Sequence, residues 1–175
     1  CAARGVEVTL VAGPVQIKAT HPNIHRIDVE SCAEMYAATT EAFKTADCGI
    51  LCAAVADFTP EKTANTKIKR EGDDLVLSLK PTHDIAAELG RIKKPHQHLV
   101  GFALETNDEH VNAQGKLVRK NLDFIVLNSL NDKGAGFRHD TNKITIISKE
   151  EVKEYPLKPK SEVAKDIIDE LSRIL

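Results

Sequence analysis

A chain of 175 residues is long enough for one domain with a buried core, and its net charge of −2 argues against a general nucleic-acid-binding protein, which would be strongly basic. With 42% hydrophobic and 29% charged residues, the composition is typical of a soluble globular protein, and no apolar run approaches the roughly 20 residues of a membrane-spanning helix. The first ten residues, CAARGVEVTL, lack the basic and apolar segments of a signal peptide, so we expect a cytoplasmic protein.

Strand-like and helix-like segments alternate along the chain. Unbroken apolar runs predict buried strands at 6–12, 49–56, 99–104 and 124–127, because a half-exposed strand would alternate polar and apolar residues. Helical periodicity predicts helices at 31–45, 84–92 and 111–121, the first with a capping box of Ser31 and Glu34, and the second capped by Asp84 or Thr82. This order predicts a doubly wound α/β domain of three layers, with a parallel sheet and helices on both faces.

Both ends of the predicted domain are less regular. The segment CAARG, with Gly5 as its cap, has the pattern of the last turn of a helix. The strand at 6–12 would then be the second of its unit, so we expect a single domain over 1–175 whose first strand and turn, the usual place of a phosphate-binding glycine loop, are missing. Further on, 74–79 predicts an exposed strand or arm, 143–148 a late strand and 161–175 a closing amphipathic helix.

The cysteines and histidines predict no metal site. The four cysteines are Cys1, Cys32, Cys48 and Cys52. They form no CxxC pair, and Cys48 and Cys52 would lie about 13 Å apart on one strand, too far for a disulfide. We therefore interpret the cysteines as small buried apolar residues. His96 and His98 could face one way on a strand, but the sequence offers no third ligand for zinc.

Polar residues follow the predicted strands, at the edge where open α/β sheets bind their ligands. Asp57 follows the strand at 49–56, Glu105 with Thr106 and Asn107 follows the strand at 99–104, and Asn128 follows the strand at 124–127. The helix start at 83–86 offers free backbone N–H groups, which suit an anion. Two groups of cations accompany these residues, namely Lys67, Lys69 and Arg70, and Lys116, Arg119 and Lys120. Together they predict a site for a triphosphate and a divalent metal ion.

Each of these features also has a purely structural interpretation. Asp57 and Asn128 are common turn residues at the ends of strands. Phe102 suits a core position, and the cations near residue 70 suit a solvated loop. Lys116 and Lys120 lie in the last turn of a predicted helix, where cations interact favourably with the helix dipole.

Six segments, taken together and in order, resemble the bacterial phosphopantothenate cysteine ligase, the synthetase domain of the bifunctional coenzyme A biosynthesis protein. They are AAVADF (53–58), TKIKR (66–70), HDIA (83–86), VGFALET (100–106), KLVRKNLDFIVLN (116–128) and GFRHDTNKITII (136–147). The resemblance implies a Rossmann-like fold, a homodimer, and ligation of 4'-phosphopantothenate to cysteine with CTP and Mg²⁺ through an acyl-cytidylate. FMN belongs only to the decarboxylase domain that precedes this domain in the bifunctional proteins.

The resemblance also implies the site residues. Lys67 would be the catalytic lysine of a mobile flap, and it would also contact the nucleotide. The other nucleotide-binding residues would be Cys52, Ala53, Asp57, His83, Asp84, Ile85, Ala86, Phe102, Lys116 and Lys120. His83 replaces the proline that is usual in the family, so contacts from the backbone of 83–86 are the safer assignment.

Some questions stay open at this point. The family's SGGTxE strand, and a following loop with an asparagine that processes the acyl intermediate, do not occur in the sequence. If this part has been removed rather than being disordered, the chain alone is expected to have little or no ligase activity. The preference for CTP over ATP is not fixed by any motif. The alternative functions are an NAD(P)-binding Rossmann-like oxidoreductase domain and a non-catalytic nucleotide-binding module.

Overall fold

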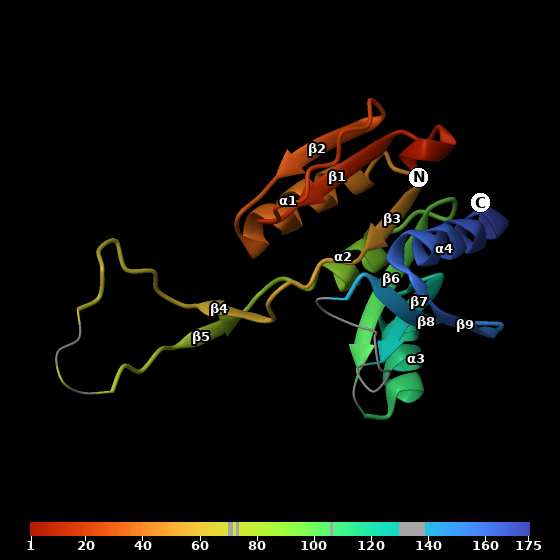
Figure 1. Ribbon diagram of the computed structural model, residues 1–175. Coiled ribbons are helices and arrows are strands. Elements are labelled where there is room, and N and C mark those ends of the chain that lie inside the picture. Colours follow the sequence, from red (N-terminus) through yellow and green to blue (C-terminus); the bar gives the residue numbers. More distant parts are fainter. Residues whose placement is uncertain (70–71, 73, 106, 130–138) are drawn as a thin grey trace.

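The structure, a computed structural model, describes residues 1–69, 72, 74–105, 107–129 and 139–175 (Figure 1). Within these residues the largest sheet has the strand order β3-β6-β7-β8-β9. Its strands are β3 (Cys48–Leu51), β6 (His98–Glu105), β7 (Phe124–Ser129), β8 (Thr141–Ser148) and β9 (Val152–Pro159). Strands β3, β6 and β7 are parallel, whereas β8 and β9 are antiparallel to their neighbours. The prediction of a wholly parallel sheet is therefore wrong for the last two strands.

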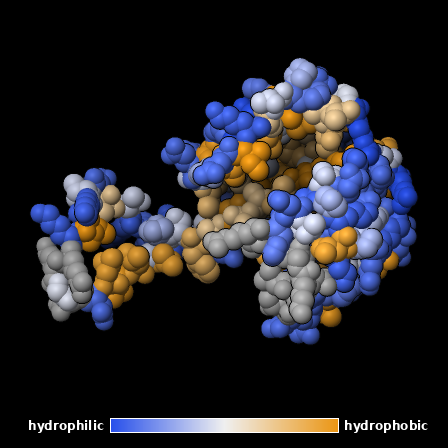
Figure 2. All heavy atoms as spheres, viewed as in Figure 1, coloured by the Kyte–Doolittle hydropathy of each residue, from blue (hydrophilic) through white to orange (hydrophobic). Residues whose placement is uncertain are grey.

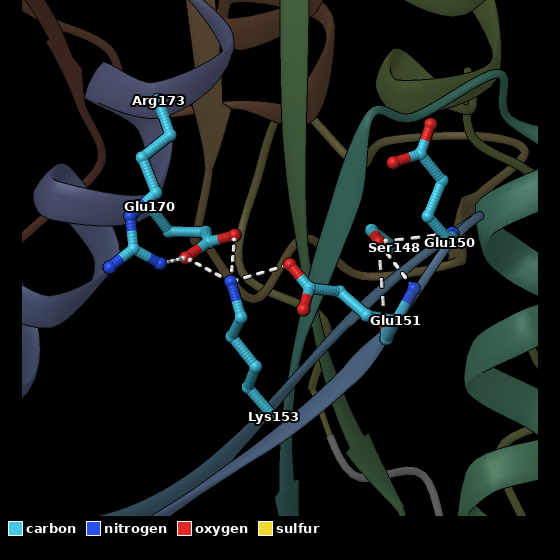
Figure 3. Close-up of polar contacts among 6 residues, drawn as sticks. All are labelled: Ser148, Glu150, Glu151, Lys153, Glu170 and Arg173. Carbon is cyan, nitrogen blue, oxygen red and sulfur yellow. Dashed lines mark hydrogen bonds and ion pairs between the residues drawn. The ribbon is translucent and has the colours of Figure 1, made fainter.

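A tight turn explains why β8 and β9 run in opposite directions. The hydroxyl oxygen of Ser148, at the end of β8, accepts hydrogen bonds from the backbone N–H groups of Glu150 and Glu151 at 3.2 and 3.1 Å (Figure 3). So short a connection can join only antiparallel strands. Strand β9 was not predicted, because its inward-facing positions include Lys153 and Lys158 and leave no apolar alternation to detect.

The sheet is covered by helices on both faces. Helices α1 (Cys32–Phe43), α2 (Ile85–Ile92) and α3 (Glu109–Arg119) contribute to one apolar cluster, in which Leu89 and Leu117 pack with Leu99 of β6. Helix α4 (Lys160–Ile174) contributes Ile167 to a second cluster with Val100 of β6. Because neighbouring residues of a strand point to opposite faces, Leu99 and Val100 belong to different clusters. The predicted three-layer α/β architecture is confirmed.

The N-terminal part forms a separate parallel pair, β1 (Val8–Ala12) and β2 (Ile24–Asp28). A short 3₁₀-helix, Ala2–Arg4, precedes it and ends at Gly5, whose φ of +84° is left-handed, so the predicted cap is confirmed. Strand β2 was not predicted, since its sequence IHRID carries two apolar residues among three polar ones. Among the described residues, β1 pairs only with β2 and β3 only with β6, which leaves one edge of each strand unpaired.

Helix caps in the structure agree with the sequence. The side chain of Ser31 accepts a hydrogen bond from the backbone N–H of Glu34, and the Glu34 carboxylate accepts one in return from the backbone of Ser31. These bonds complete the predicted capping box. Hydrogen bonds from the backbones of Glu30 and Ser31 lower the pKa of Glu34, because they favour its charged form.

The amino edge of the sheet is held by two polar side chains. Gln97, which is 3% exposed, donates from Nε2 to the carbonyl oxygen of Phe43 at the end of α1 over 2.7 Å. Asp123 accepts through Oδ2 from the backbone N–H of Leu99 at 2.6 Å and from Lys93 Nζ at 2.9 Å. Their polar groups are therefore satisfied where β6 begins.

An arm leaves the body of the molecule between β3 and α2. Strands β4 (Phe58–Pro60) and β5 (Leu79–Pro81) form its antiparallel base, and the chain between them extends away from the body (Figure 1). The exposed arm predicted at 74–79 is confirmed, although its strand lies at 79–81. Figure 2 shows apolar side chains along this arm, and Leu75, Val76 and Leu77 are all more than half exposed.

The interpretation of all four cysteines as buried residues is wrong. All four are free, and the argument against a disulfide between Cys48 and Cys52 is confirmed. Cys1 and Cys52 are exposed, because they lie at the start of the chain and after the end of β3. Cys32 and Cys48 are partly buried. Burial, with the charges of Asp123 and Asp47 nearby, raises the pKa of the Cys48 thiol to about 12. Its reactive thiolate form is thus disfavoured.

None of the described helices combines the length and the apolar character needed to cross a bilayer.

Candidate functional site

The carboxyl end of β6 brings a carboxylate and a lysine together. Along β6, Leu99 and Ala103 face the layer of α2 and α3, and Glu105 continues this alternation. Lys116 lies two turns into α3, on the same side of the sheet. Its Nζ lies 2.5 Å from Oε1 of Glu105, and the Glu105 side chain is only 14% exposed. The sequence placed Glu105 at this edge but gave it no function.

The N-terminus of α2 carries a second pair of this kind. Asp84 is the N-cap, and its side chain accepts a hydrogen bond from the backbone N–H of Ala87 at 3.0 Å, so the predicted cap is confirmed. Oδ1 of Asp84 also lies 3.1 Å from Nζ of Lys120. Burial is the largest influence on Asp84 and raises its pKa, but the bonds from Ala87 and Lys120 outweigh it and leave the pKa lowered.

Asp57 lies beside the segment that leads into α2. The backbone N–H of Thr82 donates to the carbonyl oxygen of Asp57 at 2.9 Å, and the Thr82 hydroxyl donates to the carbonyl oxygen of Ala56 at 2.7 Å. Since Thr82 precedes Asp84 by two residues, the turn after β3 is fixed next to the start of α2. The side chain of Asp57 is exposed and therefore accessible to a ligand.

His83 stacks on an aromatic residue that the sequence did not single out. The rings of Tyr36, on α1, and His83 have centroids 4.5 Å apart and planes inclined by 25°. The helical pattern of 31–45 did not distinguish Tyr36 from a core residue. Next to this pair, Ile85 is buried in the core, so its side chain is not available to a ligand. Ala86 is partly buried, whereas the side chains of His83 and Asp84 are exposed.

Three of the predicted nucleotide-binding residues lie apart from these pairs. Cys52 and Ala53 follow the end of β3 and are exposed. Phe102 is partly buried against the apolar cluster on the face of α4, opposite the face of α2 and α3. The carboxyl ends of neighbouring parallel strands share one edge, so a ligand that reaches across this edge can contact both faces.

The predicted catalytic residue, Lys67, lies on the arm. It is exposed, and the part of the arm between β4 and β5 extends away from the body, so the structure does not place it beside Lys116 or Lys120 (Figure 1). Arg70 and Thr106, and residues 136–138 of the last segment with a family resemblance, lie outside the described residues.

Asn128 takes part in the sheet rather than standing free at its edge. Nδ2 of Asn142, on β8, donates to Oδ1 of Asn128 at the end of β7 over 2.8 Å. Asn142 is 8% exposed. This contact ties two neighbouring strands together and favours the structural interpretation of Asn128.

Two cavities lie away from these side chains. One of about 170 Å³ lies between the N-terminus of α3 and strands β7 to β9, and includes Glu109, Ser129 and Glu154 in its lining. Another, of about 490 Å³, lies beyond the carboxyl ends of β1 and β2, next to Arg26 and Asp28. Neither is lined by the predicted site residues, whose charged groups lie on an open edge.

The comparison with known proteins is consistent across sequence and structure. The sequence matches the family described as "DNA/pantothenate metabolism flavoprotein C-terminal domain" over residues 1–175. It is 42% identical over 171 residues to "Coenzyme A biosynthesis bifunctional protein CoaBC" of Bacillus subtilis (strain 168), covering 97% of this chain and 42% of that protein. The solved C-terminal domain of a CoaBC protein has a TM-score of 0.82 at 33% identity, covering 99% of this chain and 76% of that chain.

Another relative has a different name. Over 168 residues the chain is 60% identical to a "Cysteine/Cysteine sulfinic acid decarboxylase" from an unknown prokaryotic organism, covering 95% of this chain and 47% of that protein. The chain thus spans a little less than half the length of these two curated relatives. From the match over all 175 residues and the shared fold, we conclude that the chain belongs to the family of the DNA/pantothenate metabolism flavoprotein C-terminal domain.

Proposed function

We propose that the chain provides the domain that joins 4'-phosphopantothenate to cysteine in coenzyme A biosynthesis, with CTP as the activating nucleotide. The observation that carries this proposal is a pair of lysines that carboxylates hold in place: Lys116 lies against Glu105 at the carboxyl end of β6, and Lys120 lies against Asp84 at the N-terminus of α2. Lysines and a helix N-terminus are the groups that proteins use for phosphates. The CoaBC names of relatives at 42% and 36% identity support the same pathway.

The proposed reaction has two steps. The carboxylate of 4'-phosphopantothenate attacks the α-phosphorus of CTP, pyrophosphate leaves, and a mixed acyl-cytidylate anhydride forms. The amine of cysteine then attacks the acyl carbon, loses a proton, and displaces CMP to form the amide. Negative charge grows on the phosphoryl oxygens in the first step, so cations held in place are the main catalytic requirement.

Each site residue has a role in this proposal. Lys116 and Lys120 neutralise phosphate oxygens. The exposed carboxylate of Asp57 would hold the Mg²⁺ that accompanies the nucleotide, since Mg²⁺ is usually held by one or two carboxylates plus substrate phosphates. Lys67 reaches the reacting phosphate when the arm closes over the site, which also keeps water from the anhydride. The backbone of Cys52 and Ala53 and the ring of Phe102 contact the remaining parts of the nucleotide.

We also propose that the protein works as a cytoplasmic homodimer. The support for a dimer is the arm, where Leu75, Val76 and Leu77 are 64%, 87% and 58% exposed. Apolar side chains in such a row are typical of a surface that a second chain covers.

Nucleotide binding and product formation test the proposal together. Thermal unfolding of the protein is measured with CTP and Mg²⁺, with ATP and Mg²⁺, and with NADH, because a ligand that binds only the folded state raises the unfolding temperature. A full-length protein that contains this domain is then incubated with 4'-phosphopantothenate, cysteine and CTP, and CMP and the amide are measured by mass spectrometry. We expect a shift with CTP and formation of the amide. A shift with NADH and none with CTP would favour a dinucleotide-binding domain instead.

A further inference from the structure

The ion pair of Glu105 and Lys116 is more deeply placed than a surface salt bridge. The two side chains are 14% and 35% exposed, and the charged atoms are 2.5 Å apart. A carboxylate largely removed from water is costly unless a cation accompanies it. In the described part of the chain, Lys116 is the cation that the structure places against this carboxylate.

Lys120 is also paired with a carboxylate, but the interaction between the two charges is weaker. Asp84 is 51% exposed, lies 3.1 Å from Lys120, and already accepts the capping bond from Ala87. Charge pairs interact more strongly as they are removed from water. Of the two lysines, Lys116 therefore has the charge that is more strongly compensated by the protein itself.

We infer that Glu105 is a positioning residue that holds Lys116 at the sheet edge and sets how strongly this lysine attracts phosphate. The inference deepens the proposed function, because it rests on Lys116 as a phosphate-binding group. An ammonium group has three N–H donors, so Lys116 keeps donors for an anion while it is bonded to Glu105. The anion, however, meets a neutral pair rather than a lone cation, and binding is weaker than Lys116 alone would give.

The substitution Glu105→Gln separates the two parts of this role. Glutamine keeps an oxygen that can accept the bond from Lys116, but it removes the negative charge beside the phosphates. Calorimetric titration with inorganic tripolyphosphate, and separately with CTP and Mg²⁺, should show affinities about fivefold tighter than those of the wild type. The gain should disappear when Lys116 is replaced as well, in Glu105→Gln with Lys116→Met.

A matched control removes a similar carboxylate elsewhere. Asp166 on α4 is 20% exposed and lies 2.7 Å from Lys158 of β9, on the face away from Lys116. Asp166→Asn should leave both anion affinities unchanged. Because a Glu105 variant can lose stability, the unfolding temperature is recorded for each protein. Glu105→Ala removes both the charge and the acceptor that holds Lys116, so it should bind tripolyphosphate less tightly than Glu105→Gln.

The outcomes separate this inference from the proposed function. The role of Glu105 is overturned by any of three results. These are unchanged or weaker tripolyphosphate binding by Glu105→Gln, a gain in affinity that persists in the double variant Glu105→Gln with Lys116→Met, and no detectable anion binding by any variant. Tighter tripolyphosphate binding, with no amide formed from CTP by the full-length wild-type protein, leaves the inference standing and removes the proposed ligation.

Discussion

Lys120 Nζ lies 3.1 Å from Asp84 Oδ1, so the C-terminal end of α3 is tied to the N-terminal end of α2. The pKa of Asp84 is lowered in the folded protein, which then binds fewer protons than the unfolded chain in acid. The stabilisation is therefore complete above the unfolded pKa of about 3.9 and is lost as the pH falls through the lower folded value.

The substitution Asp84→Asn should expose this dependence, because asparagine still caps the helix but does not carry the charge. At pH 7 we expect a loss of at most about 1 kcal/mol in the free energy of unfolding, since the Asp84 side chain is half exposed. The difference from the wild type should shrink in urea unfolding experiments as the pH is lowered through 4 to 3. A difference that stays constant over this range would assign the effect to something other than the charge of Asp84.

Two helical glycines should respond in opposite ways to alanine. A Cβ on Gly90 of α2 would lie 2.0 Å from the carbonyl oxygen of Lys120, whereas a Cβ on Gly115 of α3 would meet no atom within 4 Å. Gly90→Ala should lower the free energy of unfolding by about 2 kcal/mol or more, because backbone must move. Gly115→Ala should raise it by up to about 1 kcal/mol, because alanine favours the helix.

Denaturant unfolding of both glycine variants gives the comparison directly. If Gly90→Ala were as stable as the wild type, the close approach of α2 to the end of α3 would be contradicted.

Lys153 connects β9 to the C-terminal helix. Its ammonium lies 2.8 and 2.9 Å from the two carboxylate oxygens of Glu170, which also contacts Arg173 at 2.7 Å (Figure 3). The Glu170 side chain is 8% exposed. Lys153→Met should lower the thermal unfolding temperature, because it leaves a buried carboxylate with less compensation. Lys165→Met removes the exposed pair with Glu162 and should change this temperature little.

The arm should control association. Replacing Leu75 and Leu77 by lysine places charge on its exposed apolar row, and we expect size-exclusion chromatography with light scattering to show less dimer than in the wild type. The control is Val118→Lys, because Val118 is 71% exposed on α3, outside the arm. A monomeric wild type, or an equal loss of dimer in the control, would contradict a role of the arm in dimer formation.

Lys67 is tested by turnover. In a full-length protein that contains this domain, Lys67→Gln should lower amide formation from CTP by on the order of 100-fold, as expected for loss of a group that stabilises transition-state charge. Its unfolding temperature should not change, because Lys67 is exposed. The matched control, Lys62→Gln, removes another exposed lysine of the arm. Turnover close to that of the wild type in Lys67→Gln would contradict the proposed catalytic role of Lys67.

The fold was predictable where a segment shows one clear period. The apolar strands β6 and β7 and helices α1 to α4 were found to within a few residues, and the caps at Ser31 and Asp84 were identified from their residue types. Strands β2 and β9 were not found, because polar residues occupy much of each strand. The direction of β8 also escaped prediction, since periodicity carries no information on how neighbouring strands pair.

The sequence indicated which residues belong to the candidate site, but not which of their side chains contact one another. Lys116 and Lys120 were recognised, whereas the bond from Lys116 to Glu105 joins residues 11 positions apart on a helix and a strand, and only the packing of α3 on the sheet creates it. The stacking of Tyr36 on His83 depends in the same way on how α1 packs against α2.

The two ends of the parallel strands have different tolerances to change. At the amino end, the side chains of Gln97 and Asp123 form hydrogen bonds within the fold, so replacing them lowers the stability of the protein without changing a ligand-binding group. At the carboxyl end, the exposed side chain of Asp57 can be exchanged at little cost in stability. Substitutions that aim at a new substrate preference should therefore be made at the carboxyl ends of the strands, and the residues at the amino ends should be kept.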